Sequence, residues 1–361
     1  MHVTSVGHPY FVKRVVVSGS PFTAEPTQVG MEAGGLGTVT GTGTDLSRRR
    51  AAMGAWGELT ERYTCAVRSV HIKGYAVSAF NLTRGRPEAV PLHRVLYADR
   101  RSVFPEGCDH PYISDSLGVA CHRYSGAALQ SAWFEFMERQ SLIYNWLTAS
   151  PGRAIEPSNL VEKQLSRVRA YFSEVKMFDI SLHADLCVAL VVGTGDKFMG
   201  VGCSADWNAS EAVNGAIREL LSHVVIYLPP HAAGGRGTPT RWEVRGRTGN
   251  VYADYFYHEM TPGALWHAYS YLGQGTSHPI GRRSEGGIAK RMVTVASDLL
   301  FEPLVVHVPR HDGSAAEVVR VLGTGAYPHM RCDLLVPEQY AIHFHKGNVS
   351  VPNRGRLIPF S

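Results

Sequence analysis

The chain has 361 residues, of which 44% are apolar and 19% are charged, and 36 Lys and Arg stand against 31 Asp and Glu. This balance excludes a disordered chain, and the lack of a three-residue glycine period or of sustained heptads excludes collagen-like and coiled-coil structures. The length allows one large domain or two of ordinary size, with a sizeable core that needs no disulfides.

The net charge of +5 is modest for this length. The densest basic run, Arg48-Arg49-Arg50, is more typical of a solvated face than of a phosphate groove, so we expect no nucleic-acid partner. An anionic ligand such as a nucleotide would explain the charge equally well.

The cysteine spacing and the apolar runs indicate the compartment. No two of the cysteines lie within four residues of each other, so there is no CxxC zinc or redox motif. The N-terminus has no signal-peptide core, and no apolar run approaches membrane-spanning length. We therefore expect a cytoplasmic protein with reduced thiols and no membrane segment, with Cys187 as a buried thiol.

The predicted elements alternate along the chain. Residues 1–45 are typical of strands and glycine-rich loops: Val15–Val17 is a short strand, and residues 30–44 are a flexible loop leading into a helix, with neither a GxxxxGK[ST] nor a GxGxxG motif. Apolar periodicity predicts helices at residues 47–66, 125–147 and 209–226, the last with Asn208 as its N-cap and Glu211 in the capping box. Strands are predicted at 186–192, 304–308 and 340–345, and a loop at 229–237. We expect one α/β domain over residues 1–361.

An internal repeat is the most informative feature. The first helix contains Glu58-Leu59-Thr60-Glu61-Arg62 and the second contains Glu135-Phe136-Met137-Glu138-Arg139, so both carry E-x-x-E-R after an alanine-rich stripe with a tryptophan. Carboxylates at i and i+3 share one helix face and repel each other. If the two faces meet, four carboxylates and two guanidiniums converge, and such a cluster requires cations. Oxygen ligands suit Mg²⁺, and arginines can pair with phosphates, so the repeat predicts a magnesium–nucleotide site without a P-loop.

Plainer interpretations accompany this one. Glu58–Arg62 and Glu135–Arg139 could be ordinary i,i+4 ion pairs on two amphipathic helices, although the recurrence favours a site. Arg218-Glu219 on the third helix could join the site, but its apolar neighbours indicate core.

Three further patterns stay open. His343 and His345 share a face of the predicted strand and could be a metal pair, although no third ligand is evident. Tyr252, Tyr255 and Tyr257 recur at steps of three and two residues and could line a strand face, either in the core or against a peptide. Asp109-His110 beside Cys108 could suggest a thiol site.

The chain resembles the YcaO family, whose members use ATP to activate backbone amides of ribosomal peptides and form azolines, amidines or thioamides. The matching sequences occur in the family's order from about Gly34 to Pro328, followed by a C-terminal tail at about 346–361. They are Gly54-x3-Glu58-x2-Glu61-Arg62-Tyr63, Gly118-Val119-Ala120, Ala128 through Glu135-x2-Glu138-Arg139, Gly202 through Arg218-Glu219-Leu220, and Glu317 through Leu322.

The resemblance implies a single YcaO-like α/β domain with mixed sheets and long helices that face each other across a nucleotide site. ATP and Mg²⁺ would be the cofactors. By motif position Glu58, Glu61 and Glu138 would be magnesium ligands, and Glu135, Arg62 and Arg139 would support these ligands or contact phosphate.

The chain also departs from the family pattern. Gly54 stands where the family usually has Ser. Ahead of its second ExxER motif the family has Ser, Asn, a Glu ligand and Gln, where an ungapped comparison puts Ala120, Arg123, Ala127 and Ser131. One magnesium ligand would be missing, and Arg123 would add positive charge to the cofactor site. The tail keeps only one terminal proline, Pro359, where the family is often proline-rich.

The expected activity is therefore cyclodehydration of Cys, Ser or Thr in a precursor peptide to thiazoline or oxazoline. The chain would be one subunit of a hetero-oligomer, with a leader-binding E1-like partner and a flavin-dependent dehydrogenase. The alternatives are a thioamide-forming YcaO protein with a sulfur-delivery partner and a non-catalytic scaffold that binds peptide or nucleotide.

Overall fold

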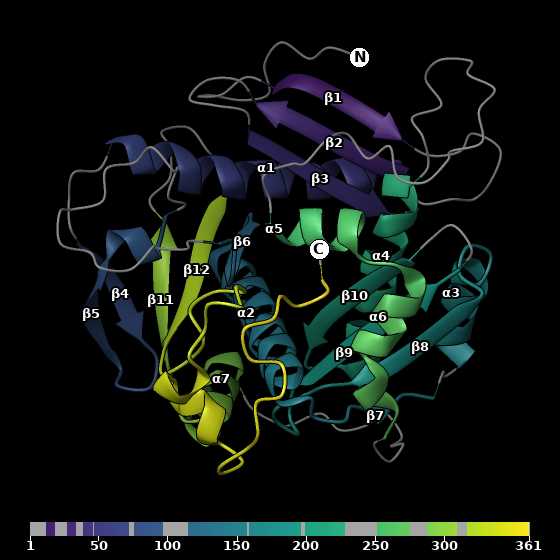
Figure 1. Ribbon diagram of the computed structural model, residues 1–361. Helices are drawn as coiled ribbons and strands as arrows, with labels where there is room; N and C mark the ends of the chain where they lie inside the picture. Colours follow the sequence, from purple (N-terminus) through teal and green to yellow (C-terminus); the bar gives the residue numbers. More distant parts are fainter. Residues whose placement is uncertain are drawn as a thin grey trace.

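Three antiparallel sheets and three long helices make up most of the computed structural model (Figure 1). The structure describes residues 12–18, 27–33, 39–45, 47–71, 76–96, 115–156, 159–195, 199–227, 251–274, 287–308 and 316–360. This mixed α/β architecture confirms the predicted fold class. Within these residues no helix is long and apolar enough to cross a membrane.

The N-terminal sheet lies directly on the first long helix. Strands β1 (Val12–Ser18), β2 (Thr27–Ala33) and β3 (Val39–Asp45) pair in that order, and β3 packs on α1 (Arg48–His71). A Cβ on Gly41 would lie 2.3 Å from the carbonyl oxygen of Ala55, and one on Gly43 would lie 2.1 Å from that of Ala51. The prediction of a flexible glycine loop was therefore wrong for residues 30–33, which lie in β2, and for residues 39–44, which lie in β3. Gly41 and Gly43 allow β3 to touch the helix backbone.

A five-stranded sheet has the order β5-β4-β11-β12-β6. Its strands are β4 (Ala76–Asn81), β5 (Arg86–Pro91), β6 (Val119–His122), β11 (Glu302–Val308) and β12 (Glu317–Thr324). The long helix α2 (Ser125–Thr148) packs against β6 and β12.

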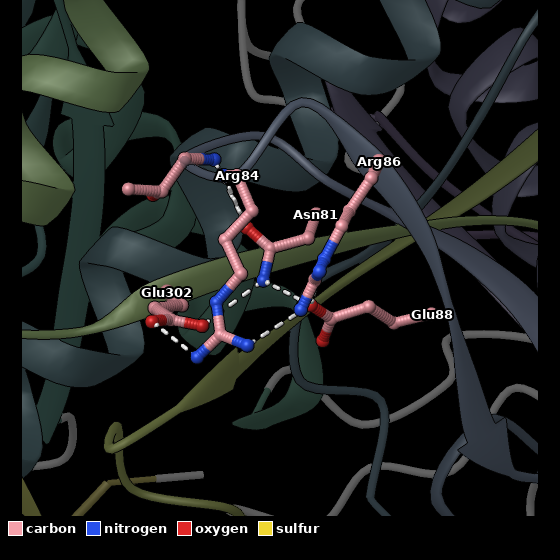
Figure 2. A network of polar contacts seen from close by, with 6 residues as sticks. Asn81, Arg84, Arg86, Glu88 and Glu302 are labelled. Atoms are coloured by element: carbon pink, nitrogen blue, oxygen red, sulfur yellow. Dashed lines mark hydrogen bonds and ion pairs between the residues drawn. The ribbon is translucent and has the colours of Figure 1, made fainter.

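A polar network ties the β4–β5 hairpin to the start of β11 (Figure 2). The amide of Asn81 donates to Glu88 at 3.1 Å and to Glu302 at 3.0 Å, and the Arg84 guanidinium lies 2.8 Å from Glu302. The network fixes the edge of the sheet, away from the residues that line the cavity described below.

The four-stranded sheet is covered on both faces. Its order is β10-β9-β8-β7, with β7 (Arg153–Ala154), β8 (Glu174–Asp179), β9 (Cys187–Thr194) and β10 (Met199–Asp206). On β9, Ala189 and Val191 belong to a core cluster with α3 (Asn159–Val168) and α4 (Ala209–Tyr227), whereas Val188 and Leu190 belong to the cluster formed with α2. Burial of both faces explains why this strand is a continuous apolar run.

The predicted long helices are confirmed to within a few residues. The observed bounds are 48–71, 125–148 and 209–227. Asn208 caps α4 as predicted, since its side-chain oxygen accepts the backbone N–H of Ser210 at 3.0 Å. Strands 186–192 and 304–308 correspond to β9 and β11, and Val15–Val17 lies in β1. The predicted loop at 229–237 lies outside the described residues.

Two strand predictions were wrong. Residues 340–345 contain a short 3-10 helix, η5 (Ala341–Phe344), where the backbone N–H of Ile342 donates to the carbonyl of Gly325 at 2.9 Å. Tyr252 lies in α5 (Val251–Asp254), and Tyr255 and Tyr257 lie in a π-helical turn, η2 (Tyr255–Glu259). Aromatic residues at short spacing indicate a strand only where a neighbouring strand can pair with them, and none of the described strands pairs with this segment.

The remaining elements connect these layers. They are η1 (Leu92–Arg94), α6 (Pro262–Ala268), η3 (Ser270–Gln274), α7 (Ile288–Asp298) and η4 (Pro337–Gln339). The C-terminal tail then runs back across the molecule toward α5 (Figure 1). Ile358 and Phe360 near its end are buried.

Candidate functional site

A cavity of about 1180 Å³ lies where α1, α2 and α4 meet. The charged residues that line it are Glu58 and Arg62 from α1, Glu135, Glu138 and Arg139 from α2, Arg218 and Glu219 from α4, and Asp115 and Arg331 from connecting segments. The two ExxER motifs therefore contribute to one cavity, as the sequence predicts.

On the α1 side, strand β3 holds the carboxylate. Thr42 donates to Glu58 through its hydroxyl at 2.8 Å and through its backbone N–H. Arg62 forms an ion pair with Glu58 and donates to the carbonyl of Thr40 at 3.0 Å. The ordinary i,i+4 pair is thus present on α1, and it lies inside the cavity.

Electrostatic coupling shows that the two motif faces meet. Burial raises the pKa of Glu61 well above its ordinary value, and the carboxylates of Glu135 and Glu58 raise it further. Glu61 does not itself appear among the residues that line the cavity. It lies close enough to Glu135 on the other helix for their charges to repel.

On the α2 side the carboxylates are unusually basic. Burial raises the pKa of Glu135 to about 8, although Arg139 and Arg320 lower it. Burial likewise raises the pKa of Glu138 well above its ordinary range. Arg139 forms an ion pair with Glu138 at 3.0 Å. This pair joins adjacent residues, whereas the pair on α1 joins residues four positions apart.

The third helix, α4, also contributes a carboxylate to the cavity, although the apolar neighbours of Glu219 indicated a place in the core. Glu219 accepts the backbone N–H of Cys203 at 2.6 Å, and burial raises its pKa. The apolar residues around it do form core, but Arg218 and Glu219 both line the cavity. Arg218 and Glu219 lie on a different face of α4 from the apolar residues that form the core.

Arg320 and Phe360 lie near the site but were not predicted as site residues. Arg320 on β12 is only 2% exposed and donates to the carbonyls of Val95 and Asp115, each at 2.8 Å. Its charge lowers the pKa of Glu61 and of Glu135. An arginine inside the apolar run Val318–Leu322 was the available signal.

The tail residue Phe360 also reaches the cavity. Its ring centroid lies 4.7 Å from the guanidinium carbon of Arg139, within the range of a cation–π contact. The sequence showed that the tail is poor in proline, but it did not indicate that Phe360 reaches the cavity.

The structure does not bring Arg123 to the cavity. Arg123 is exposed, and its guanidinium lies 5.6 Å from the ring centroid of Tyr124. Its proposed role at the cofactor site therefore stays a prediction. The segment with Cys108, Asp109 and His110 lies outside the described residues.

The histidine pair is accounted for by packing. His343 is 1% exposed, and its Nδ1 lies 3.0 Å from the hydroxyl of Tyr327, whereas Nδ1 of His345 lies 2.8 Å from the carbonyl of Ile342. Burial lowers the pKa of both imidazoles. Without a shared strand face, the two do not form the suggested metal pair.

In the described part of the chain Cys65, Cys121, Cys187, Cys203 and Cys332 are free. The prediction of a buried thiol at Cys187 was wrong, since this residue at the start of β9 is partly exposed. Its partial burial still raises the pKa of the thiol to about 12, so the thiol stays protonated at neutral pH.

The carboxylates fit a cation that is bound together with an anion. Across the described ranges no group of three or more His, Cys, Asp and Glu forms a ready metal cage. Magnesium, however, is commonly bound through one or two carboxylates plus substrate phosphates and water. Burial raises the pKa of these glutamates, so a bound cation would stabilise their charged form. The neighbouring arginines could pair with phosphate oxygens.

The cavity thus combines acidic side chains from facing helices with arginines in an α/β fold. The model of the YcaO cyclodehydratase family, described as "ATP-ad Mg2+-binding", matches residues 67–326. The chain therefore belongs to the YcaO family. No functionally curated protein matches it.

Solved structures share the fold at low sequence identity. YcaO from Methanopyrus kandleri, bound with AMPPCP and Mg²⁺, has a TM-score of 0.65 and 17% identity, over 87% of this chain and 86% of that one. A chain of the Escherichia coli microcin synthetase McbBCD complex has a TM-score of 0.73 and 14% identity, with 100% of both chains covered. The same complex with pro-MccB17 bound gives 0.72 and 16%, over 98% of both chains.

Proposed function

We propose that this protein is an ATP- and magnesium-dependent enzyme that activates backbone amides of a ribosomal precursor peptide. The product is a thiazoline or oxazoline made from Cys, Ser or Thr with loss of water. The observation that supports this most directly is the cavity between the two ExxER helices in a member of the YcaO family.

The residues have distinct proposed roles. Glu58, Glu61 and Glu138 would hold Mg²⁺, while Arg62 and Arg139 would contact phosphate oxygens and Glu135 would support the ligands. ATP, when bound, supplies the phosphoryl group that makes the amide oxygen a good leaving group. Thr42 and Thr40 on β3 hold Glu58 and Arg62 in place, so the α1 half of the site is oriented before any ligand binds.

The proposed assembly is a cytoplasmic hetero-oligomer. A leader-binding E1-like protein would deliver the precursor peptide, and a flavin-dependent dehydrogenase would oxidise azolines to azoles. Chains with this fold occur in the microcin synthetase complex, including one with pro-MccB17 bound, which supports a peptide substrate and a multi-protein complex.

The test is co-expression with the precursor and the partner, followed by mass spectrometry. The wild type is expected to remove one water per ring, and Glu61→Gln and Glu138→Gln are expected to abolish this loss. Glu162→Gln, which removes a carboxylate of the exposed Glu162–Arg169 pair on α3, is the matched control and should behave as wild type. Unchanged dehydration in both the Glu61→Gln and the Glu138→Gln variant would show that the proposed site is wrong.

A non-catalytic scaffold is the second candidate, and Ala127 at the family's additional glutamate position favours it. The complex would then assemble normally but would show no Mg²⁺-dependent binding of nucleotide. An exchange of oxygen for sulfur in the product mass would instead select thioamide formation.

A further inference from the structure

A second cavity, of about 410 Å³, lies beside the one described above. It is lined from the end of β3, the first turn of α1, and α3 and α4, and its charged residues are Asp45, Arg50, Arg167, Glu211 and Arg218. Thr44 and Arg218 line both cavities, so the two adjoin. None of the roles proposed above uses this smaller cavity.

The arginines of the smaller cavity carry charges that no described carboxylate neutralises. Among the residues that the structure describes, none forms an ion pair with Arg50, Arg167 or Arg218. Arg218 donates only to its own helix, through Nε to the backbone carbonyl of Asn214 at 3.2 Å. Three guanidiniums without counter-ions around one cavity indicate a site for an anion.

The two carboxylates of the smaller cavity already have local roles. Asp45 accepts the backbone N–H of Ser47 at 2.7 Å, directly ahead of α1. Glu211 lies in the first turn of α4, where the helix dipole stabilises its charge. The excess of guanidiniums and the N-terminal end of α1 together favour a bound anion.

The proposed reaction produces such an anion in the adjoining cavity. The γ-phosphoryl group of ATP is transferred to the amide oxygen, and that oxygen then leaves with it as inorganic phosphate. ADP is the other product, and the two hydrogens lost from the nucleophile and the amide nitrogen leave as protons. The smaller cavity has room for a tetrahedral oxyanion with several waters, since a water molecule takes up about 30 Å³ in the liquid.

We propose that the smaller cavity binds the inorganic phosphate released by the reaction, with Arg50, Arg167 and Arg218 as its cationic ligands. Arg218 lines both cavities and connects the place where phosphate forms to the place where it is held. Guanidiniums suit this role because their paired N–H groups match two phosphate oxygens. The source of the phosphate rests on the proposed function, whereas its binding can be measured without any turnover.

The test is calorimetric titration of inorganic phosphate into the assembled complex. Saturating Mg²⁺–AMPPCP is present throughout, so that the proposed nucleotide site in the larger cavity is filled. The wild type is expected to bind one phosphate per chain under these conditions. Arg50→Gln and Arg167→Gln should each weaken this binding about tenfold, the equivalent of one charge-assisted hydrogen bond.

A matched control and a conservative replacement show whether the effect is specific. Arg169 lies two positions after Arg167 but forms an exposed ion pair with Glu162 and lines neither cavity, so Arg169→Gln should bind phosphate as the wild type does. Arg167→Lys keeps the charge but not the planar fork and should restore part of the affinity that Arg167→Gln loses. Arg50 is exposed and Arg167 is partly exposed, so neither substitution threatens the fold.

Three results would overturn the proposal. They are phosphate binding that Mg²⁺–AMPPCP abolishes, an unchanged phosphate affinity in both Arg50→Gln and Arg167→Gln, and a loss of affinity for the precursor peptide alone in these variants. The last result would assign the smaller cavity to a peptide carboxylate. Rings that form without phosphate binding would refute this inference and leave the proposed function intact. Arginine-dependent phosphate binding would support the site even if no rings form.

Discussion

At the scale of single residues, opposing influences act on the buried carboxylates. Burial disfavours the charge of Glu135, while Arg139 and Arg320 favour it, and the pKa settles at about 8. Glu61, Glu138 and Glu219 shift in the same direction for the same first cause. With a pKa of about 8, Glu135 is therefore largely protonated near neutral pH.

This shift predicts how stability depends on pH. A carboxyl whose folded pKa is raised stabilises the folded state fully at pH values below its ordinary pKa, and that contribution is lost as pH rises toward the folded pKa of about 8. We expect the melting temperature to fall between pH 6 and pH 8.5, and less steeply in Glu135→Gln. Thermal unfolding over a pH series measures this, and equal slopes in both proteins would contradict it. Mg²⁺ with nucleotide should restore more stability at the higher pH.

The buried arginine of β12 gives a second residue-scale prediction. Replacing Arg320 by Met leaves the carbonyls of Val95 and Asp115 without their donor and removes a charge near Glu61 and Glu135. Stability should fall by about 3 kcal/mol, measured by denaturant unfolding. Arg169→Met removes only an exposed ion pair with Glu162 and should cost less than about 1 kcal/mol. Similar losses in the two variants would show that Arg320 is not a structural anchor.

At the scale of elements, the contact of β3 with α1 orients the first motif. Glycines at 41 and 43 allow the strand to approach the helix backbone, and Thr42 between them holds Glu58. The packing of β3 against α1 thus determines both the local stability and the position of Glu58, one of the predicted magnesium ligands.

Adding a methyl group to the strand tests this contact. A Cβ at Gly43 would lie 2.1 Å from the carbonyl oxygen of Ala51 and 2.5 Å from the backbone nitrogen of Ala55, so Gly43→Ala must displace the strand. We expect a loss of about 2–3 kcal/mol in unfolding free energy, together with weaker Mg²⁺–nucleotide binding. Gly57→Ala on α1 meets nothing within 4 Å and should be neutral or stabilising by up to about 1 kcal/mol. If Gly43→Ala melts as the wild type does, the strand is not held against the helix.

At the scale of the whole molecule, Phe360 of the C-terminal tail lines the cavity that earlier segments of the chain surround. Asn353 donates to the carbonyl of Trp146 at 2.9 Å, and the hydroxyl of Tyr269 donates to that of Pro359 at 3.1 Å. These bonds connect the tail to α2 and to the segment after α6, so that Phe360 packs on Arg139.

Truncating that ring should loosen the tail. Phe360→Ala is expected to cost about 3 kcal/mol, since the side chain is only 3% exposed and covers a guanidinium. Chemical denaturation measures the loss, and limited proteolysis should release the tail sooner than in the wild type. Phe344→Ala, at a residue 37% exposed, should have a much smaller effect. Equal effects would contradict a specific role for the tail.

The sequence by itself determined the long helices, the mixed α/β class and which residues of each ExxER motif share a helix face, because helical periodicity sets the direction of each side chain. It also identified the YcaO family, whose model matches residues 67–326. It predicted a strand at 340–345 wrongly, because alternation says nothing about whether a partner strand is available.

Only the tertiary structure decided which faces meet. It brought Glu219, Arg320 and Phe360 to the cluster, left Arg123 exposed, and placed Tyr257 against His223 across 34 positions of sequence. The physical reason is that burial and electrostatic coupling depend on distances between elements remote in the chain. A local pattern shows which side chains point together, but packing determines what they point at.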